Sequence, residues 1–99
     1  MATEEQIMEK LATVEDPELR ESIVDLGLVY GVEDIDGIVN VTMTLTSPGC
    51  PMGAMIEGAV KDAVAQLDDV TDVRVEIVWT PRWDPRIHAS EDVKIKYNL

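Results

Sequence analysis

The chain has no phenylalanine, a single cysteine and a single histidine among its 99 residues. One cysteine excludes an internal disulfide framework and fits a reducing compartment, so we expect a cytoplasmic protein. No apolar run approaches the length that crosses a bilayer, and no charged-then-apolar leader with a cleavage site is present. Membrane insertion and export are therefore not expected. With four aromatic residues, the core must be built from Val, Ile, Leu, Met and Ala.

Basic residues are also scarce, because eight Lys and Arg stand against twenty Asp and Glu and the net charge is −12. A field of this sign repels phosphate backbones and anionic lipids, which argues against nucleic acid and membrane surfaces as partners. The acids are scattered along the chain, which is typical of a surface that keeps a protein soluble. At this length and with 45% hydrophobic content, we expect residues 1–99 to form a single domain with one core.

Enzyme signatures are missing as well. The chain has no phosphate-cradling glycine loop, no dinucleotide fingerprint and no cysteine pair for redox exchange. A cysteine nucleophile normally needs a nearby base, and the only histidine, His88, lies far along the chain from Cys50. We therefore expect a protein that is not an enzyme.

The first half of the chain predicts one helix and two strands. Thr3 followed by Glu4, Glu5 and Gln6 has the form of a capping box, and apolar residues then recur at helical spacing. This helix should end before Asp16-Pro17, and residues 16–27 read as an ordered connection rather than a strand. Residues 28–35 and 38–46 alternate in the manner of strands, and Asp36-Gly37 between them is a strong hairpin signal. In the second strand, one face is buried and the other is polar or only lightly packed.

The second half predicts a further helix and strand. An apolar stripe from Met52 to Leu67 indicates a helix that ends near Asp68, and residues 73–79 alternate like a strand. Three strands with at least two helices indicate a small α+β sandwich. The tail is ambiguous, because residues 93–99 alternate like a strand while Ser90-Glu91-Asp92 looks like a helix start.

The most informative residue is Cys50, which lies where a strand pattern stops and a helix pattern starts. Pro51 suits the first helical position, so Cys50 would be the N-cap. A thiol there faces free backbone N–H groups and the positive end of the helix dipole, which favour the thiolate. The plain alternative is a small buried residue that closes a turn. Pro48, Gly49 and Pro51 favour the functional interpretation, because they restrict the loop and open its backbone to other molecules.

Other candidates around this cysteine have structural alternatives. Asp16 could supply an oxygen ligand, a base for the thiol, or a turn cap, and the cap is the commoner use of an Asp-Pro pair. Glu18 more plausibly faces solvent. Thr46 and Ser47 could hydrogen-bond to the sulfur or cap the loop. Trp83, between two prolines, could anchor the C-terminal segment or a partner, and the residues do not decide between these roles.

The remaining soft or basic side chains favour structural roles. Met43, Met52 and Met55 are thioethers that could touch a metal, but packing is the favoured interpretation. His88 falls in an apparently exposed segment, and a metal-ligand role receives low weight.

Four motifs in order carry a resemblance to a known family. They are residues 16–19 (Asp-Pro-Glu-Leu), 23–30 (Ile-Val-Asp-Leu-Gly-Leu-Val-Tyr), 43–51 (Met-Thr-Leu-Thr-Ser-Pro-Gly-Cys-Pro) and 83–85 (Trp-Asp-Pro). The chain resembles the metal-sulfur cluster biosynthetic family, with its SufT-type, PaaD-type and eukaryotic cytosolic iron-sulfur targeting members.

The resemblance implies an α-β-β-α-β core with a C-terminal helix that has Asn98 near its end, and a role in maturing iron-sulfur proteins. It also implies that Cys50 is the functional cysteine and that Asp16 and Glu18 form an acidic motif near its loop. One departure is Arg82, which follows Pro81 where SufT-type members often have a second proline, and it puts the shape of the C-terminal loop in question.

Iron-sulfur clusters are usually held by four thiolates, and this chain supplies one. Our hypothesis is that Cys50 holds iron or a cluster in transit, with none stably bound, while a second copy, a small thiol or a recipient apo-protein completes the ligand set. A homodimer is one such arrangement. Two alternatives stay open: an adaptor that docks apo-proteins to a cluster donor or scaffold, with Cys50 only structural, and a PaaD-like assembly helper of a ring-oxygenase complex.

Overall fold

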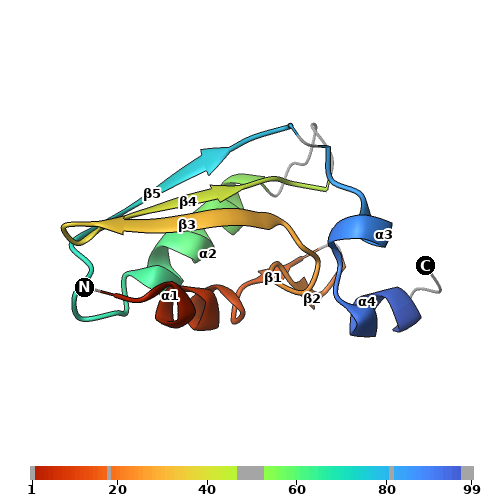
Figure 1. Ribbon diagram of the computed structural model, residues 1–99, viewed down its shortest axis with the longest axis horizontal. Helices are drawn as coiled ribbons and strands as arrows, with labels where there is room; N and C mark the ends of the chain where they lie inside the picture. The colour runs from red at the N-terminus through yellow and green to blue at the C-terminus, as the bar shows by residue number, and fades with distance from the viewer. Residues whose placement is uncertain (1, 18, 47–52, 81, 97–99) are drawn as a thin grey trace.

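The computed structural model describes residues 2–17, 19–46, 53–80 and 82–96. Two longer helices lie on one face of a three-stranded sheet, and two short helices lie at one end of it (Figure 1). This is the small α+β sandwich that the sequence predicts. In chain order the elements are α1 (Glu4–Leu11), β1 (Glu15–Asp16), β2 (Glu21–Ser22), β3 (Val29–Ile35), β4 (Ile38–Met43), α2 (Gly53–Val64), β5 (Asp72–Ile77), α3 (Pro85–His88) and α4 (Glu91–Lys96).

Helix α1 begins with the predicted capping box. The amide of Gln6 donates to Oγ1 of Thr3 at 3.1 Å, and the amide of Thr3 donates to Oε1 of Gln6 at 3.0 Å. Two of the amides that a helix start leaves without a partner are thereby satisfied, which stabilises the helix by about 1 kcal/mol. Ile7 and Leu11 are buried on the inner face of this helix.

The sheet has the order β3-β4-β5, with β4 in the centre. Strands β3 and β4 form an antiparallel hairpin in which Ile35 pairs with Ile38. Asp36 and Gly37 have φ angles of 53° and 88°, so both adopt the left-handed conformation that a two-residue hairpin turn requires. Helix α2 then carries the chain over to β5, which pairs with β4 in parallel.

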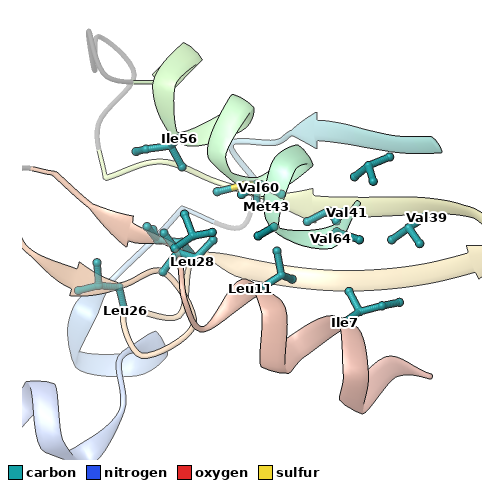
Figure 2. Close-up of a cluster of buried hydrophobic side chains, with 14 of the residues drawn as sticks. Ile7, Leu11, Leu26, Leu28, Val39, Val41, Met43, Ile56, Val60 and Val64 are labelled. Atoms are coloured by element: carbon teal, nitrogen blue, oxygen red, sulfur yellow. The ribbon is translucent and has the colours of Figure 1, made fainter. Parts of the chain in front are cut away.

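The core lies between the sheet and the two longer helices (Figure 2). The inner face of β4 presents side chains that are fully buried, and α1 and α2 cover them with aliphatic residues. The described core is built almost entirely from the aliphatic residue types that the sequence predicts. The central members are Ile7, Leu11, Val39, Val41, Met43, Ile56, Val60 and Val64.

The polar face of β4 is more buried at its end than the sequence predicts. Asn40 and Thr42 are half-buried, but Thr44 is only 1% exposed. Its hydroxyl makes no hydrogen bond within the described part of the chain. A buried hydroxyl without a partner destabilises the fold by its desolvation cost.

Several element boundaries differ from the expectations. Residues 16–27 contain strand residues, which the sequence does not predict. Strands β1 and β2 pair there, with Asp16 opposite Glu21. Strand β4 ends at Met43 rather than at residue 46, since its parallel partner β5 ends opposite it at Ile77. Helix α2 ends at Val64 rather than near Asp68. Residues after it form tighter turns, with the amide of Leu67 bonded to the carbonyl of Val64.

The C-terminal segment is helical, as the family resemblance implies. Ser90 precedes α4, and its Oγ accepts the amide of Val93 at 3.4 Å. The first turn of α4 is acidic and its last turn is basic, which suits the helix dipole. Asn98, expected near the end of this helix, lies outside the described residues. Among the described ranges, no helix has both the length and the apolar character that crossing a membrane requires.

Candidate functional site

The cysteine loop, which we define as residues 46–52, connects the central strand to α2. Thr46 is half-buried at its start, while Ser47, Cys50 and Met52 lie outside the described residues, as does Glu18. The structure describes the strand before the cysteine loop and the helix after it. Strand β4 ends at Met43, and α2 begins at Gly53. The first turn of α2 therefore directly follows the segment that contains the cysteine.

The two residues that flank the cysteine loop, Leu45 and Gly53, lie close together. A Cβ atom added to Gly53 would lie 2.9 Å from Cδ1 of Leu45, which is closer than real contacts allow. Leu45 itself is buried. A larger residue at the first position of α2 would therefore have to displace the end of the Leu45 side chain.

The start of α2 differs electrostatically from the starts of α1 and α4. Helices α1 and α4 carry two acidic residues each in their first turns, whereas the first turn of α2 has none. The positive end of the α2 dipole is thus not offset by a carboxylate of its own first turn. The first amides of a helix have no partner within the helix, and together with the dipole they favour an anionic group in the preceding loop.

Asp16 is fully buried in β1. Its Oδ1 accepts the amide of Leu19 at 3.3 Å, and its carbonyl accepts the amide of Arg20 at 2.7 Å. Arg20 has a φ angle of 56°, so the chain turns sharply here. These are the bonds of a turn cap, and the bond from Leu19 offsets part of the cost of burying the carboxylate.

Trp83 anchors the C-terminal segment to the body of the protein. Its indole N–H donates to the carbonyl of Leu26 at 2.7 Å, and its ring packs against the core. The amide of Ser90 donates to the carbonyl of Asp25 at 2.6 Å. A Cβ on Gly27, which has a φ angle of 75°, would lie 2.0 Å from the carbonyl oxygen of His88.

Two of the four sequence motifs therefore meet in space. The Asp25-Leu26-Gly27 turn is the surface on which the segment from Trp83 to Ser90 docks. Sequence reasoning missed this docking function, because a Leu-Gly pair signals only a turn. The close approach at Gly27 depends on a residue that lies more than half the chain away.

The other candidate ligands are placed as follows. Nδ1 of His88 lies 3.0 Å from both the amide and the carbonyl of Asp84, and its ring lies 5.4 Å from that of Tyr30. Met43 is fully buried in the core, but Met55 is 61% exposed, so the packing interpretation is wrong for Met55. Within the described ranges, no three His, Cys, Asp or Glu residues come together as a metal site.

Sequence comparisons match the chain to a family of known role. The family model for an iron-sulfur cluster assembly protein matches residues 4–77. The chain is 53% identical over 83 residues to the Fe-S protein maturation auxiliary factor YitW of Bacillus subtilis, which covers 83% of this chain and 81% of that protein. It is 52% identical over 69 residues to the Fe-S protein maturation auxiliary factor SufT of Staphylococcus aureus, with 69% and 78% covered.

Structural comparison agrees with this result. A crystal structure from Bacillus anthracis, described as a domain of unknown function, matches with a TM-score of 0.89 and 38% sequence identity. The match covers 97% of this chain and 92% of that one. On the matched residues 4–77, the identity to the two maturation factors and the shared fold, the chain belongs to the iron-sulfur cluster assembly protein family.

Proposed function

We propose that this protein is an auxiliary factor for the maturation of iron-sulfur proteins and that Cys50 carries iron or a cluster in transit. The role named for the relatives from Bacillus subtilis and Staphylococcus aureus supports the first part. The second part rests on the chemistry of this chain. Its one thiol is the softest ligand that it has for iron.

The observation that carries the proposal is the start of α2. Its first turn has no acidic residue, and Gly53 packs against Leu45 at the base of the cysteine loop. An anionic sulfur just before this helix is favoured by the free amides and by the positive end of the dipole. A thiolate is the form that binds iron, so the site would be ready to accept it at neutral pH.

Incomplete ligation suits a carrier. One thiolate cannot saturate a cluster that usually takes four, so the remaining ligands come from a second copy of the chain, a small thiol or the recipient apo-protein. Cargo held in this way can be passed on when the recipient supplies its own cysteines. No bond of a substrate is broken, so we propose a non-catalytic role. Free thiols persist in a reducing compartment, and we place this role in the cytoplasm.

Anaerobic reconstitution with ferric iron, sulfide and a small thiol as co-ligand tests the proposal. The wild-type chain should develop the visible absorption of an iron-thiolate species, and Cys50→Ser should stay colourless. Met55→Leu is a matched control, because it removes an exposed thioether of α2 without touching the thiol. Equal colour in wild type and Cys50→Ser would refute the role of this cysteine.

The adaptor alternative predicts a different outcome of the same experiment. An adaptor should remain colourless in its wild-type form and still accelerate cluster transfer between a scaffold and an apo-protein. A dedicated helper of a ring oxygenase would show this acceleration with that oxygenase alone.

A further inference from the structure

The C-terminal helices present apolar side chains to solvent. Ile87 on α3 is 72% exposed and Ile95 on α4 is 76% exposed, more than any other large apolar residue in the described part of the chain. The segment that carries them is held firmly, since Trp83 bonds to Leu26 and Val93 is buried. These two isoleucines are therefore exposed on a segment that is anchored to the rest of the domain.

The same segment is unusually basic for this protein. Residues 82–96 hold four of the eight basic residues and only three of the twenty acidic residues. Arg82 and Arg86 are exposed, and neither makes an ion pair with a described residue. The other two bases, Lys94 and Lys96, already pair with carboxylates. We call the exposed group Arg82, Arg86, Ile87 and Ile95 the C-terminal patch.

The opposite end of the molecule has the reverse character. The hairpin of β3 and β4 and the helices α3 and α4 lie at the two ends of the long axis, which measures 40 Å (Figure 1). Ile35 at the hairpin is 50% exposed, and Glu33 and Asp36 beside it are exposed. We call these three residues the hairpin patch. The turn before β5 adds further exposed carboxylates, Asp68, Asp69 and Asp72.

Basic side chains near the hairpin end are already engaged. Arg74 pairs with Asp72 at 3.6 Å, and the ammonium of Lys10 donates to Gln66 at 3.1 Å. Neither Glu33 nor Asp36 makes an ion pair with a described residue. Negative charge is therefore in excess at the hairpin patch, while two guanidinium groups without a described ion pair stand at the C-terminal patch.

We propose that the C-terminal patch of one copy docks on the hairpin patch of a second copy. Each patch includes exposed isoleucine, and Arg82 and Arg86 of one patch are opposite in charge to Glu33 and Asp36 of the other. The exposed acids of α4, Glu91 and Asp92, lie outside the C-terminal patch as defined. The rest of the chain is strongly acidic, so most other orientations of two copies bring carboxylates against carboxylates. Long-range repulsion therefore selects the orientation in which the arginines meet the hairpin. The contact does not depend on the proposed function, because it uses no cargo and no residue of the cysteine loop.

Sedimentation velocity of the cargo-free protein tests this contact. The sedimentation coefficient of the wild type should rise with protein concentration. Glu33→Lys and Arg86→Glu should each weaken association by about tenfold, because each places like charges in contact. The double variant restores opposite signs and should associate as the wild type does. Met55→Asp is the control, since it puts a charge on an exposed apolar position outside both patches.

Mixing provides an independent check. A head-to-tail contact uses different surfaces on the two copies, so each single variant retains one intact end. An equimolar mixture of Glu33→Lys and Arg86→Glu should form a complex that neither variant forms alone. A wild type that stays monomeric at every concentration, a double variant as weak as the singles, or a mixture without a complex would overturn the proposal.

Discussion

Replacing Gly27 by alanine should detach the C-terminal segment from the Asp25-Leu26-Gly27 turn. Gly27 has a φ angle of 75°, a conformation that costs an L-residue about 1–2 kcal/mol. The new Cβ would also lie 2.0 Å from the carbonyl oxygen of His88. The contacting atom belongs to the backbone, so no side-chain rotation relieves the overlap. The segment that contains His88 must move away.

That movement breaks the hydrogen bonds that hold the segment. The bonds from Trp83 to Leu26 and from Ser90 to Asp25 contribute about 1 kcal/mol each. Together with the backbone strain, the loss amounts to about 3–4 kcal/mol. Domains of this size are stable by about 5–15 kcal/mol, so the sheet and α1 should remain folded while α3 and α4 detach.

Amide hydrogen exchange gives the clearest measurement. In Gly27→Ala, the amides of residues 87–96 should exchange much faster, while those of β4 keep their protection. The indole fluorescence of Trp83 should shift toward that of solvent-exposed tryptophan. Gly58→Ala is the matched control, because a Cβ at this exposed position in α2 meets nothing within 4 Å. This control should be more stable than wild type by about 0.5–1 kcal/mol.

If the amides of α3 and α4 are as well protected from hydrogen exchange in Gly27→Ala as in the wild type, this prediction is refuted. It also fails if protection is lost equally in β4 and α4, because the segment would then unfold together with the whole domain.

Three further substitutions test individual groups. Thr44→Val removes a buried hydroxyl without a described hydrogen bond and should raise the free energy of unfolding in urea by about 1 kcal/mol; a decrease would show that the hydroxyl is needed. Trp83→Phe keeps an apolar ring but leaves the carbonyl of Leu26 without its donor. This change should lower the free energy of unfolding by about 1–3 kcal/mol, and an unchanged urea midpoint would contradict the prediction. Burial raises the pKa of the Tyr30 hydroxyl, so its stabilising contribution is present below about pH 10 and is lost as the pH rises through the raised value. Tyr30→Phe should therefore lose less stability than the wild type in urea titrations above about pH 10, and equal losses would contradict the assignment.

Features set by neighbouring residues were predictable from the sequence. The Thr3–Gln6 capping box and the Asp36-Gly37 turn each depend on a few adjacent residues, and the structure has both. The burial of alternate residues in β4 follows from the period of a strand. The β1–β2 pair was not predictable, because strands of two residues show no periodicity and form only where the turn after Asp16 brings them together.

The candidate site also combines features set by neighbouring residues with features set by distant ones. The position of Cys50 before a helix follows from local pattern, whereas the docking of Trp83 on Leu26 joins residues that are far apart in the chain. Exposure of Met55 could not be read from its apolar character, since helical spacing alone places it close to the inner face. The contact of Trp83 and the exposure of Met55 depend on residues that are far apart in the chain. A single sequence does not show such contacts directly.

The order in which the strands and helices are synthesised affects how the chain folds in the cell. Every strand in the described part of the chain precedes residue 78, and the family match also ends at Ile77. The ribosome therefore releases all material for the sheet and its two covering helices before α3 and α4 emerge. Because the Asp25-Leu26-Gly27 turn is made earlier, the segment from Trp83 to Ser90 finds its docking surface already synthesised and can close over it when α3 and α4 emerge.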